Sequence, residues 1–398
     1  MSLSFRASLV VALALIVMAC HGDDENNGAP TPLPSFDNTV LSIARATDGS
    51  GDVYAGGDFT TYDGAQAIRA GRLNANGTID AGFATALGFN GSVRSIVPAG
   101  NQGANLYVGG DFTTYNGIQK NRIVRINANG AFDQAFSIGT GFDNTVQVIT
   151  PENGTGNLYV GGDFSTYNGI NMNRLVRLKA DGSVDPTFVI GTGFNNTVFI
   201  VVPAADASGD LYVGGAFTSY KGLTTNNLVR LHADGTIDQT FVTGTGFDNT
   251  VFTLLPADDG SGDLHVGGAF NHYNGNVANN LIRLNANGVR DLSFATGMGF
   301  NNTVSHVVPA GDGSGDLYVG GAFTSYNGLQ GNEVVRLNQN GTMDLAFSTG
   351  AGFSNPVLRL APVGDGSGDV YVAGEFTAYQ STPIGRFVRL TPTGFFVR

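Results

Sequence analysis

Seven arginines recur at one place in a repeated phrase, and a set of this kind could form a basic surface for a polyanion. They are Arg72, Arg125, Arg177, Arg230, Arg283, Arg336 and Arg389. Each precedes a turn such as NANG (74–77), whose three-residue hairpin loop places Arg72 directly opposite Asp80. An acid recurs at this opposing place as Asp133, Asp185, Asp238, Asp291 and Asp344, and only Val397 departs from it. We therefore predict cross-strand ion pairs rather than a polyanion site.

A second basic set, at the start of the third strand of each repeat, varies together with an acid eleven residues earlier. Arg69, Arg122, Arg174 and Arg386 follow Asp58, Asp111, Asp163 and Glu375. In three other repeats the acid becomes Ala216, Ala269 or Ala322, and the arginine becomes Asn227, Asn280 or Glu333. Residues that appear and disappear together behave as contacting residues, so we predict that Asp111 contacts Arg122. The alternative is a basic arc for an anionic ligand.

The loop DGSGD (48–52, 259–263, 312–316 and 365–369) has the acids that a calcium site would need. Calcium takes six to eight oxygen ligands, often with three or more acidic side chains from one loop. Each loop offers two or three acids, and two repeats have QGAN and NGTGN instead. A tight hairpin turn is the preferred interpretation, and calcium binding stays open.

Catalytic motifs are lacking in the sequence. There is no nucleophile elbow, zinc-ligand spacing or phosphate-binding loop, and the single cysteine is Cys20. The histidines beyond the first 35 residues are His232, His265, His272 and His306, of which His265 replaces a repeated tyrosine and His272 a repeated serine or threonine. We predict no catalytic residue, no metal site and no cofactor. The alternative is a cell-surface propeller enzyme, a hydrolase or lyase that acts on glycans.

Composition and charge narrow the class of protein further. The chain has 398 residues, of which 42% are hydrophobic and only 13% are charged, so it can bury a large core. Its 59 glycines suit a fold with frequent turns. The net charge of −12 argues against nucleic acid as a partner.

A phenylalanine marks each copy of the repeat that must position these residues. It recurs as Phe36, Phe89, Phe142, Phe194, Phe247, Phe300 and Phe353, about 53 residues apart. Each repeat has four strand-like runs, for example TVSHVVPA (303–310), DLYVGGAFTSY (316–326), EVVRLNQ (333–339) and TMDLAF (342–347). The pattern predicts an all-β fold: a seven-bladed β-propeller of four-stranded antiparallel blades. The blades are 36–88, 89–141, 142–193, 194–246, 247–299, 300–352 and 353–398.

The terminal repeats keep the apolar pattern of the middle ones, so they must pack on each other and close a ring. The last repeat has only 46 residues, and APTPLPS (29–35) is too proline-rich for a replacement strand. We expect closure by packing between blades.

The phrases YVGGDFTTYNG (107–117) and VRLNANG resemble the delta-60 repeats of bacterial surface proteins. The resemblance covers nearly all of 36–398 and implies a propeller without an assigned activity.

The amino-terminal segment has the features of a secretory signal. A 13-residue apolar run (7–19) is too short to span a bilayer and ends at VMAC, with Cys20. This resembles the lipobox of bacterial lipoproteins, which implies a signal peptide over 1–19, lipidation of Cys20 and a tether over 20–35. His21 after the cysteine favours the outer membrane by the same resemblance. The alternative is a chance cysteine at the end of an ordinary signal peptide.

Two positions near the start of the innermost strand break the repeat. After a uniform valine, the first reads Leu41, Arg94, Gln147, Phe199, Phe252, Ser305 and Leu358, and the second reads Ser42, Ser95, Val148, Ile200, Thr253, His306 and Arg359. This end of the propeller also carries the longer loops. We predict that Arg94, His306 and Arg359 bind an anionic or polar ligand, from a protein or a glycan. The alternative is that these positions face solvent or pack loosely.

Taken together, the sequence predicts a lipid-anchored, non-catalytic binding or scaffolding module of the bacterial envelope.

Overall fold

Short strands form in each repeat because apolar residues fill both faces of a run such as LYVGG (106–110), which is buried along its length. The computed structural model describes residues 33–83, 86–100, 105–152 and 154–397. Leu33–Arg398 forms one compact unit. In the described residues, seven sheets share one antiparallel order, in which the second strand of a repeat lies between the first and the third.

Three strands in each sheet follow one another outward. The innermost strands are β1 (Val40–Arg45), β6 (Val93–Pro98), β11 (Val146–Pro151), β16 (Val198–Pro203), β21 (Val251–Pro256), β26 (Val304–Pro309) and β31 (Val357–Pro362). The middle strands are β2 (Val53–Gly57), β7 (Leu106–Gly110), β12 (Leu158–Gly162), β17 (Leu211–Gly215), β22 (Leu264–Gly268), β27 (Leu317–Gly321) and β32 (Val370–Gly374). The third strands are β5 (Ala70–Leu73), β10 (Ile123–Ile126), β15 (Leu175–Leu178), β20 (Leu228–Leu231), β25 (Leu281–Leu284), β30 (Val334–Leu337) and β35 (Phe387–Leu390).

A small hairpin lies between the middle and third strands of every repeat. The hairpins pair β3 (Thr61–Tyr62) with β4 (Ala65–Gln66), β8 (Thr114–Tyr115) with β9 (Ile118–Gln119), β13 (Thr166–Tyr167) with β14 (Ile170–Asn171), β18 (Ser219–Tyr220) with β19 (Leu223–Thr224), β23 (His272–Tyr273) with β24 (Asn276–Val277), β28 (Ser325–Tyr326) with β29 (Leu329–Gln330), and β33 (Ala378–Tyr379) with β34 (Thr382–Pro383).

The fourth run of each repeat differs from the prediction. In six sheets it makes only a single bridge to the third strand, as between Leu73 and Ile79, and only the last sheet has a fourth strand, β36 (Phe396–Val397), in the described residues. The turn before it is as predicted. Asn74 donates its N–H to the carbonyl of Thr78, and Gly77 has the positive φ of 81° that the bulge requires.

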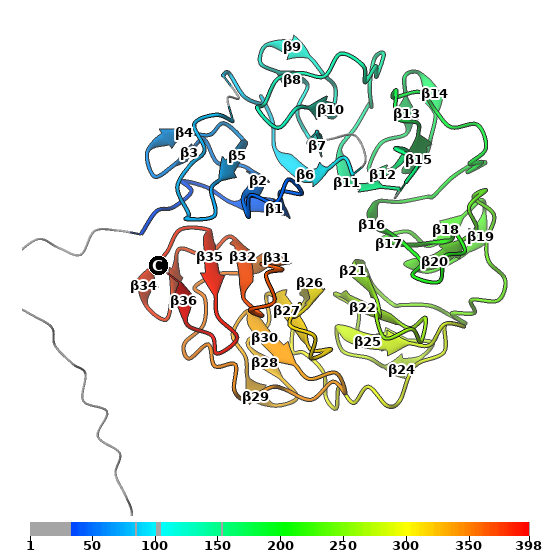
Figure 1. Cartoon of the computed structure of the whole chain (residues 1–398). Helices are drawn as coiled ribbons and strands as arrows, with labels where there is room; N and C mark the ends of the chain where they lie inside the picture. Colours follow the sequence, from blue (N-terminus) through cyan, green and yellow to red (C-terminus); the bar gives the residue numbers. More distant parts are fainter. Residues whose placement is uncertain (1–32, 84–85, 101–104, 153, 398) are drawn as a thin grey trace, which may run out of the picture. The chain divides into compact units, whose positions relative to one another are not determined.

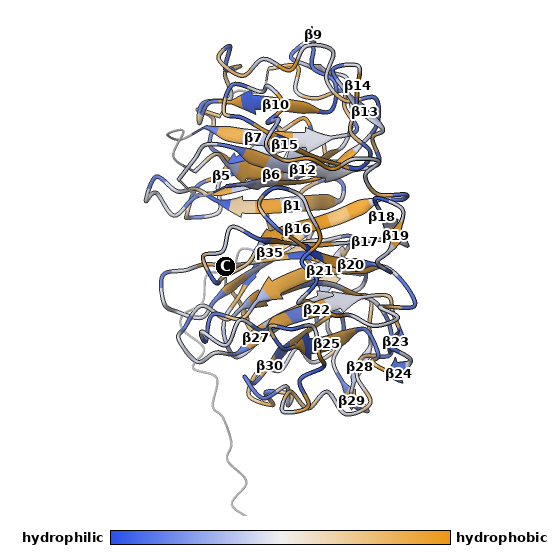
Figure 2. Cartoon of the chain, turned by 90° about the vertical axis from the view of Figure 1, so that its right-hand side faces the viewer, coloured by the Kyte–Doolittle hydropathy of each residue, from blue (hydrophilic) through white to orange (hydrophobic). Residues whose placement is uncertain are grey.

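The sheets are arranged around a common axis. Each innermost strand contacts the next one along the chain, and β31 contacts β1, so the set closes on itself (Figure 1). In Figure 2 the apolar colour gathers on strands such as β1, β16 and β21. The all-β propeller fold predicted from the repeat is confirmed.

The repeated phenylalanine is buried in the core of each repeat, next to the small hairpin. Phe36 packs on Phe59 and Tyr62, with ring centroids 4.3 and 4.7 Å apart, and the other six repeats have the same trio. The Tyr62 hydroxyl donates to the carbonyl of Gly77 at 2.8 Å, which ties the hairpin to the NANG turn. The glycine at position 56 is required because an added Cβ would lie 2.4 Å from Val93 of the next sheet.

Candidate functional site

A β-bulge sets the direction of the two positions that break the repeat. In the first sheet Val40 pairs with Gly57 and Ser42 with Gly56, so Leu41 is the extra residue. The same irregularity occurs in all seven innermost strands. We call the extra residue the first axial position and the next residue the second axial position. A bulge re-aims side chains locally, and here it does so at the end of the strand away from the DGSGD turn.

Arg94, at a first axial position, is held by an acid of its own sheet. Its guanidinium lies 2.8 Å from the Asp111 carboxylate, and in the next repeat Gln147 donates to Asp163 at the same distance. Asp111 also accepts the Thr145 hydroxyl at 2.6 Å. Burial raises the pKa of Asp111, but hydrogen bonds from Arg94 and Thr145 outweigh it and hold that pKa below its usual value.

The predicted contact between Asp111 and Arg122 is wrong. In the described residues Asp111 forms an ion pair with Arg94, and Arg122 affects the pKa of Asp111 only through its charge. In the equivalent place, Arg174 donates to the carbonyl of Phe164 and the hydroxyl of Ser165 at 3.0 and 2.9 Å. In the first repeat the guanidinium of Arg69 donates to the backbone carbonyl of Asp58, so the arginine contacts the backbone at or next to the acid rather than its carboxylate.

His306, at a second axial position, links two innermost strands. Its Nδ1 accepts the backbone N–H of Leu360 at 3.2 Å, as the hydroxyl of Ser42 accepts the N–H of Ile96 at 3.1 Å. Burial, together with the charge of Arg359, lowers the pKa of His306 to about 3. The imidazole is therefore neutral at physiological pH, and since Nδ1 accepts, the proton is on Nε2.

Arg359 takes the same position in the last sheet but has a different environment. It donates to the carbonyl of Leu358 at 2.9 Å and forms no ion pair in the described part of the chain. Burial and the charge of Arg94 lower its pKa to about 10, so it stays charged at neutral pH. Of the three predicted site residues, Arg94 pairs with an acid, His306 accepts a backbone N–H, and Arg359 donates to the carbonyl of its neighbour. Ligand binding by the three stays a prediction.

Two phenylalanines that the sequence interpretation did not single out lie at first axial positions on neighbouring strands. The half-buried rings of Phe199 on β16 and Phe252 on β21 contact each other with centroids 5.2 Å apart. They stand in sheets where the acid has become Ala216 and Ala269. The sequence does contain a signal for this pair, because both phenylalanines stand at the same position of the repeat as Arg94. This end of the axis thus combines cationic side chains with an aromatic pair.

At the other end of the sheets, the acids of the DGSGD loop contact arginine. Arg72 lies 2.7 Å from Asp48, 2.8 Å from Asp52 and 3.5 Å from Asp80, which confirms the predicted cross-strand pair. The same pair forms in the five following repeats. Among the described residues, no group of three or more histidine, cysteine, aspartate or glutamate side chains is arranged to hold a metal ion.

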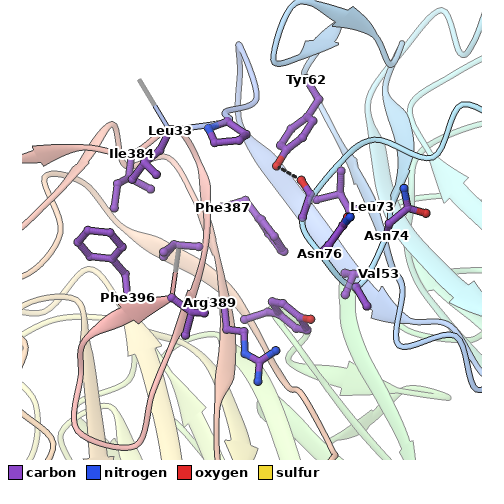
Figure 3. Close-up of a pocket in the computed structure, with 16 residues that line it drawn as sticks. Leu33, Val53, Tyr62, Leu73, Asn74, Asn76, Ile384, Phe387, Arg389 and Phe396 are labelled. Atoms are coloured by element: carbon purple, nitrogen blue, oxygen red, sulfur yellow. Dashed lines mark hydrogen bonds between the residues drawn. The ribbon is translucent and has the colours of Figure 1, made fainter. Parts of the chain in front are cut away.

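A pocket lies at the closure interface, which we define as the contact between the last sheet and the first. Figure 3 shows Leu33, Ile384 and Phe396 on one side, Leu73 and Asn76 on the other, and Phe387 between them. The cavity has a volume of about 180 Å³, and Val53, Tyr371 and Arg389 also line it. We call it the closure pocket.

The fold and the repeats define the chain as a β-propeller. A family model described as a domain of unknown function (DUF5122) beta-propeller matches 49–83, 105–136, 154–188, 207–241, 261–294 and 313–347, more than half of the chain. The chain belongs to this family.

Solved structures show the same fold at low sequence identity. The WD40 β-propeller domain of Doa1 is 14% identical with a TM-score of 0.55, and the match covers 87% of this chain and 95% of that one. A chain of the mitotic checkpoint complex is 15% identical with a TM-score of 0.52, covering 92% and 98%. No curated protein is significantly similar in sequence. Such similarities show the fold alone.

Two further observations concern the membrane. Cys20, the predicted lipidation site, lies outside the described residues. The part of the chain that the structure describes contains no helix with the length and apolar character needed to cross a membrane.

Proposed function

We propose that the protein is a lipid-anchored propeller of the bacterial envelope that acts as a non-catalytic binding or scaffolding module. In this proposal the seven sheets are seven blades of the delta-60 type, each with an outermost fourth strand that is reduced to a bridge in six of them. The lipobox resemblance at VMAC, with Cys20, supports the anchor. The anchor would hold the propeller at the outer membrane, where a binding surface can act.

One observation carries the proposed binding role. The arginines repeated at the DGSGD end pair with acids. The axial positions instead bring an arginine without an acid, Arg359, to the same end of the axis as the Phe199–Phe252 pair. A cation at the same end of the axis as aromatic rings suits an extended acidic glycan or an acidic protein segment, since the guanidinium pairs with an anion and the rings pack on an apolar face.

The alternative of a glycan hydrolase or lyase needs acids that are free to transfer protons. The two acids that contact first axial positions, Asp111 and Asp163, are held by Arg94 and Gln147. This observation favours binding over catalysis.

A binding screen tests the proposal. The mature protein is screened against acidic glycans and envelope proteins, and each ligand found is measured again with Arg359→Ala. We expect at least a tenfold loss of affinity at an unchanged melting temperature. Lys179→Ala, which removes an exposed charge elsewhere, is the matched control. Equal affinity in Arg359→Ala and wild type would reject the axial site.

The anchor is tested separately. Intact-mass analysis of protein purified from membranes should show acyl groups on the mature amino terminus, and Cys20→Ser should lack them. An unacylated wild-type protein in the membrane fraction would contradict the proposed anchor.

A further inference from the structure

A histidine replaces a repeated tyrosine in the middle strand of the fifth repeat. The residue is His265, and the other six repeats have Tyr54, Tyr107, Tyr159, Tyr212, Tyr318 and Tyr371 at this position. The tyrosine hydroxyl both donates and accepts hydrogen bonds. That of Tyr318 donates at 2.7 Å to the carbonyl of Gly368, in the DGSGD turn of the next repeat, and that of Tyr212 accepts from Arg230 at 3.3 Å. Because histidine has no hydroxyl, the fifth repeat makes neither bond.

A cavity of about 430 Å³ lies at this place, between the sheet β21–β22–β25 and the sheet β26–β27–β30. His265 and Arg283 line it from the fifth repeat, and Gly315, the counterpart of Gly368, lines it from the sixth. We call this cavity the His265 pocket.

The corresponding space between the first two sheets is closed. Tyr54 and Pro98 line it where His265 and Pro309 line the His265 pocket, and its volume is about 0 Å³. The change from tyrosine to histidine therefore accompanies an open pocket between two sheets.

The imidazole of His265 is fixed and uncharged. The ring is 5% exposed, and Phe294 packs edge-on against it with centroids 5.1 Å apart. Burial and the charge of Arg283 lower the pKa of His265 to about 4, although a backbone hydrogen bond with Leu255 acts in the opposite direction. Its Nδ1 is buried without a hydrogen-bond partner in the described residues, so Nε2 is the nitrogen that a ligand can reach. A hydroxyl can bond Nε2 whichever nitrogen carries the proton, because a hydroxyl donates and accepts.

The two groups that serve the tyrosine hydroxyl in other repeats are present in the pocket. Arg283 uses its Nε and Nη2 for two aspartates, at 2.9 and 2.6 Å, and its Nη1 has no hydrogen-bond partner within the described ranges. Nη1 is the atom that Arg230 donates to the Tyr212 hydroxyl. The carbonyl of Gly315 takes the place of the Gly368 acceptor. A ligand group that bonds both must accept from the arginine and donate to the carbonyl, which a hydroxyl does and which neither a carboxylate nor an ammonium can do.

The remaining walls supply further polar and apolar contacts. Gln339 is exposed and lines the pocket, and at its position the other repeats have Ala75, Ala128, Ala180, Ala233, Ala286 and Pro392. Asp258 adds an exposed carboxylate, and Pro256 and Pro309 add apolar surface. Several separate hydrogen-bonding groups beside apolar rings suit a ligand with several hydroxyls on a carbon ring.

We propose that the His265 pocket binds a sugar unit, in which one hydroxyl accepts from Arg283 and donates to the carbonyl of Gly315, and another hydroxyl bonds His265. The ligand is a free sugar or the end of a glycan, which share this chemistry. The pocket lies among the DGSGD turns, so the site is separate from the axial positions and does not depend on the function proposed for them.

The test measures binding of neutral sugars to the full mature protein. D-glucose, D-galactose, D-mannose and N-acetyl-D-glucosamine are titrated one at a time by saturation-transfer NMR. At least one should bind with a millimolar Kd, because a single sugar unit makes few contacts. Each sugar that binds is then compared with its own disaccharide. Weaker binding of the disaccharide indicates a free sugar as the ligand, and equal or tighter binding indicates a glycan end.

Variants that restore the repeat locate the site. His265→Tyr returns the residue found in the other six repeats, so it should fold like wild type, fill the pocket and weaken sugar binding at least tenfold. Gln339→Ala restores the repeated alanine and should weaken binding by a smaller factor. His272→Ser is the matched control, because it also replaces a histidine by the repeated residue but at an exposed hairpin that does not line the pocket. It should bind sugar like wild type, and melting temperatures are measured for all variants.

Three outcomes would overturn the proposal. The first is that none of the four sugars binds the wild-type protein. The second is equal binding by His265→Tyr and wild type at similar melting temperatures. The third is binding that Arg359→Ala removes and His265→Tyr keeps, which would assign the sugar to the axial end. Because Arg359 does not line this pocket, failure here leaves ligand binding at the axial site to be decided by its own experiment.

Discussion

The two ends of the sheets use charge in opposite ways. At the end with the DGSGD turns, Arg230 is 8% exposed and lies within 3.2 Å of Asp206, Asp210 and Asp238, and most repeats have a similar cluster. At the axial end, Arg359 has no acid within ion-pairing distance in the described residues. The arginine repeated at the DGSGD end is therefore neutralised by repeated acids, whereas Arg359, which breaks the repeat at the axial end, has no acid to neutralise it.

The largest expected effect is at the clustered end. Arg230→Ala leaves three acids close together without their cation, so we expect the free energy of unfolding to fall by about 3 kcal/mol. Arg359→Ala removes a cation that repels Arg94, and we expect it to leave stability unchanged or slightly higher. Urea unfolding of both variants measures the difference. Equal losses would contradict the distinction between the two ends.

A smaller effect concerns Glu333, which occupies the place of Asn227 and Asn280. Those amides are buried and donate to the carbonyls of Gly215 and Gly268 at 2.9 and 3.0 Å. A carboxylate cannot donate, the Oε2 of Glu333 has no hydrogen-bond partner, and burial raises its pKa from 4.5 to about 7. The folded state therefore binds this proton more tightly than the unfolded chain does.

The sign of the pH dependence follows from that shift. The stability contributed by protonated Glu333 is present below about pH 4.5, declines between pH 4.5 and about 7, and is lost above that. Glu333→Asn should raise the free energy of unfolding by about 1–2 kcal/mol at pH 8, after allowing for partial exposure, and by much less at pH 4.5. Thermal melts at both pH values measure it, and the same gain at both would refute the account.

His306 sharpens the comparison because it lies at the axial end yet has a structural partner. His306→Ser keeps an acceptor for the Leu360 N–H, as in the bond from Ile96 to Ser42, so stability should change by less than about 1 kcal/mol. His306→Val removes the acceptor and should cost about 1–2 kcal/mol. If both variants are as stable as wild type, the hydrogen bond does not explain the histidine.

Much of the architecture could be predicted because a repeat displays its own pattern. The first three strand runs of each repeat, the NANG turn and the pair between Arg72 and Asp80 depend on local spacing, and the structure confirms them. The partner of Asp111 could not be predicted in the same way. The β-bulge at Arg94 brings this side chain to the acid. A bulge cannot be recognised from residue types at a position that already differs from repeat to repeat.

The smallest expected effect tests the corrected pairing at the axial end. A double-mutant cycle of Arg94→Ala and Asp111→Ala should give a coupling free energy of about 0.5 kcal/mol, because both side chains are about one-third exposed and water weakens their attraction. The cycle of Arg122→Asn and Asp111→Ala should give a coupling near zero, since the charge of Arg122 acts without a direct contact. The two cycles share one variant, so their comparison is internally controlled. A larger coupling free energy for Arg122 than for Arg94 would restore the pairing of Asp111 with Arg122 that the sequence predicts. Arg94 would then be a cation without an acid partner at the axial end.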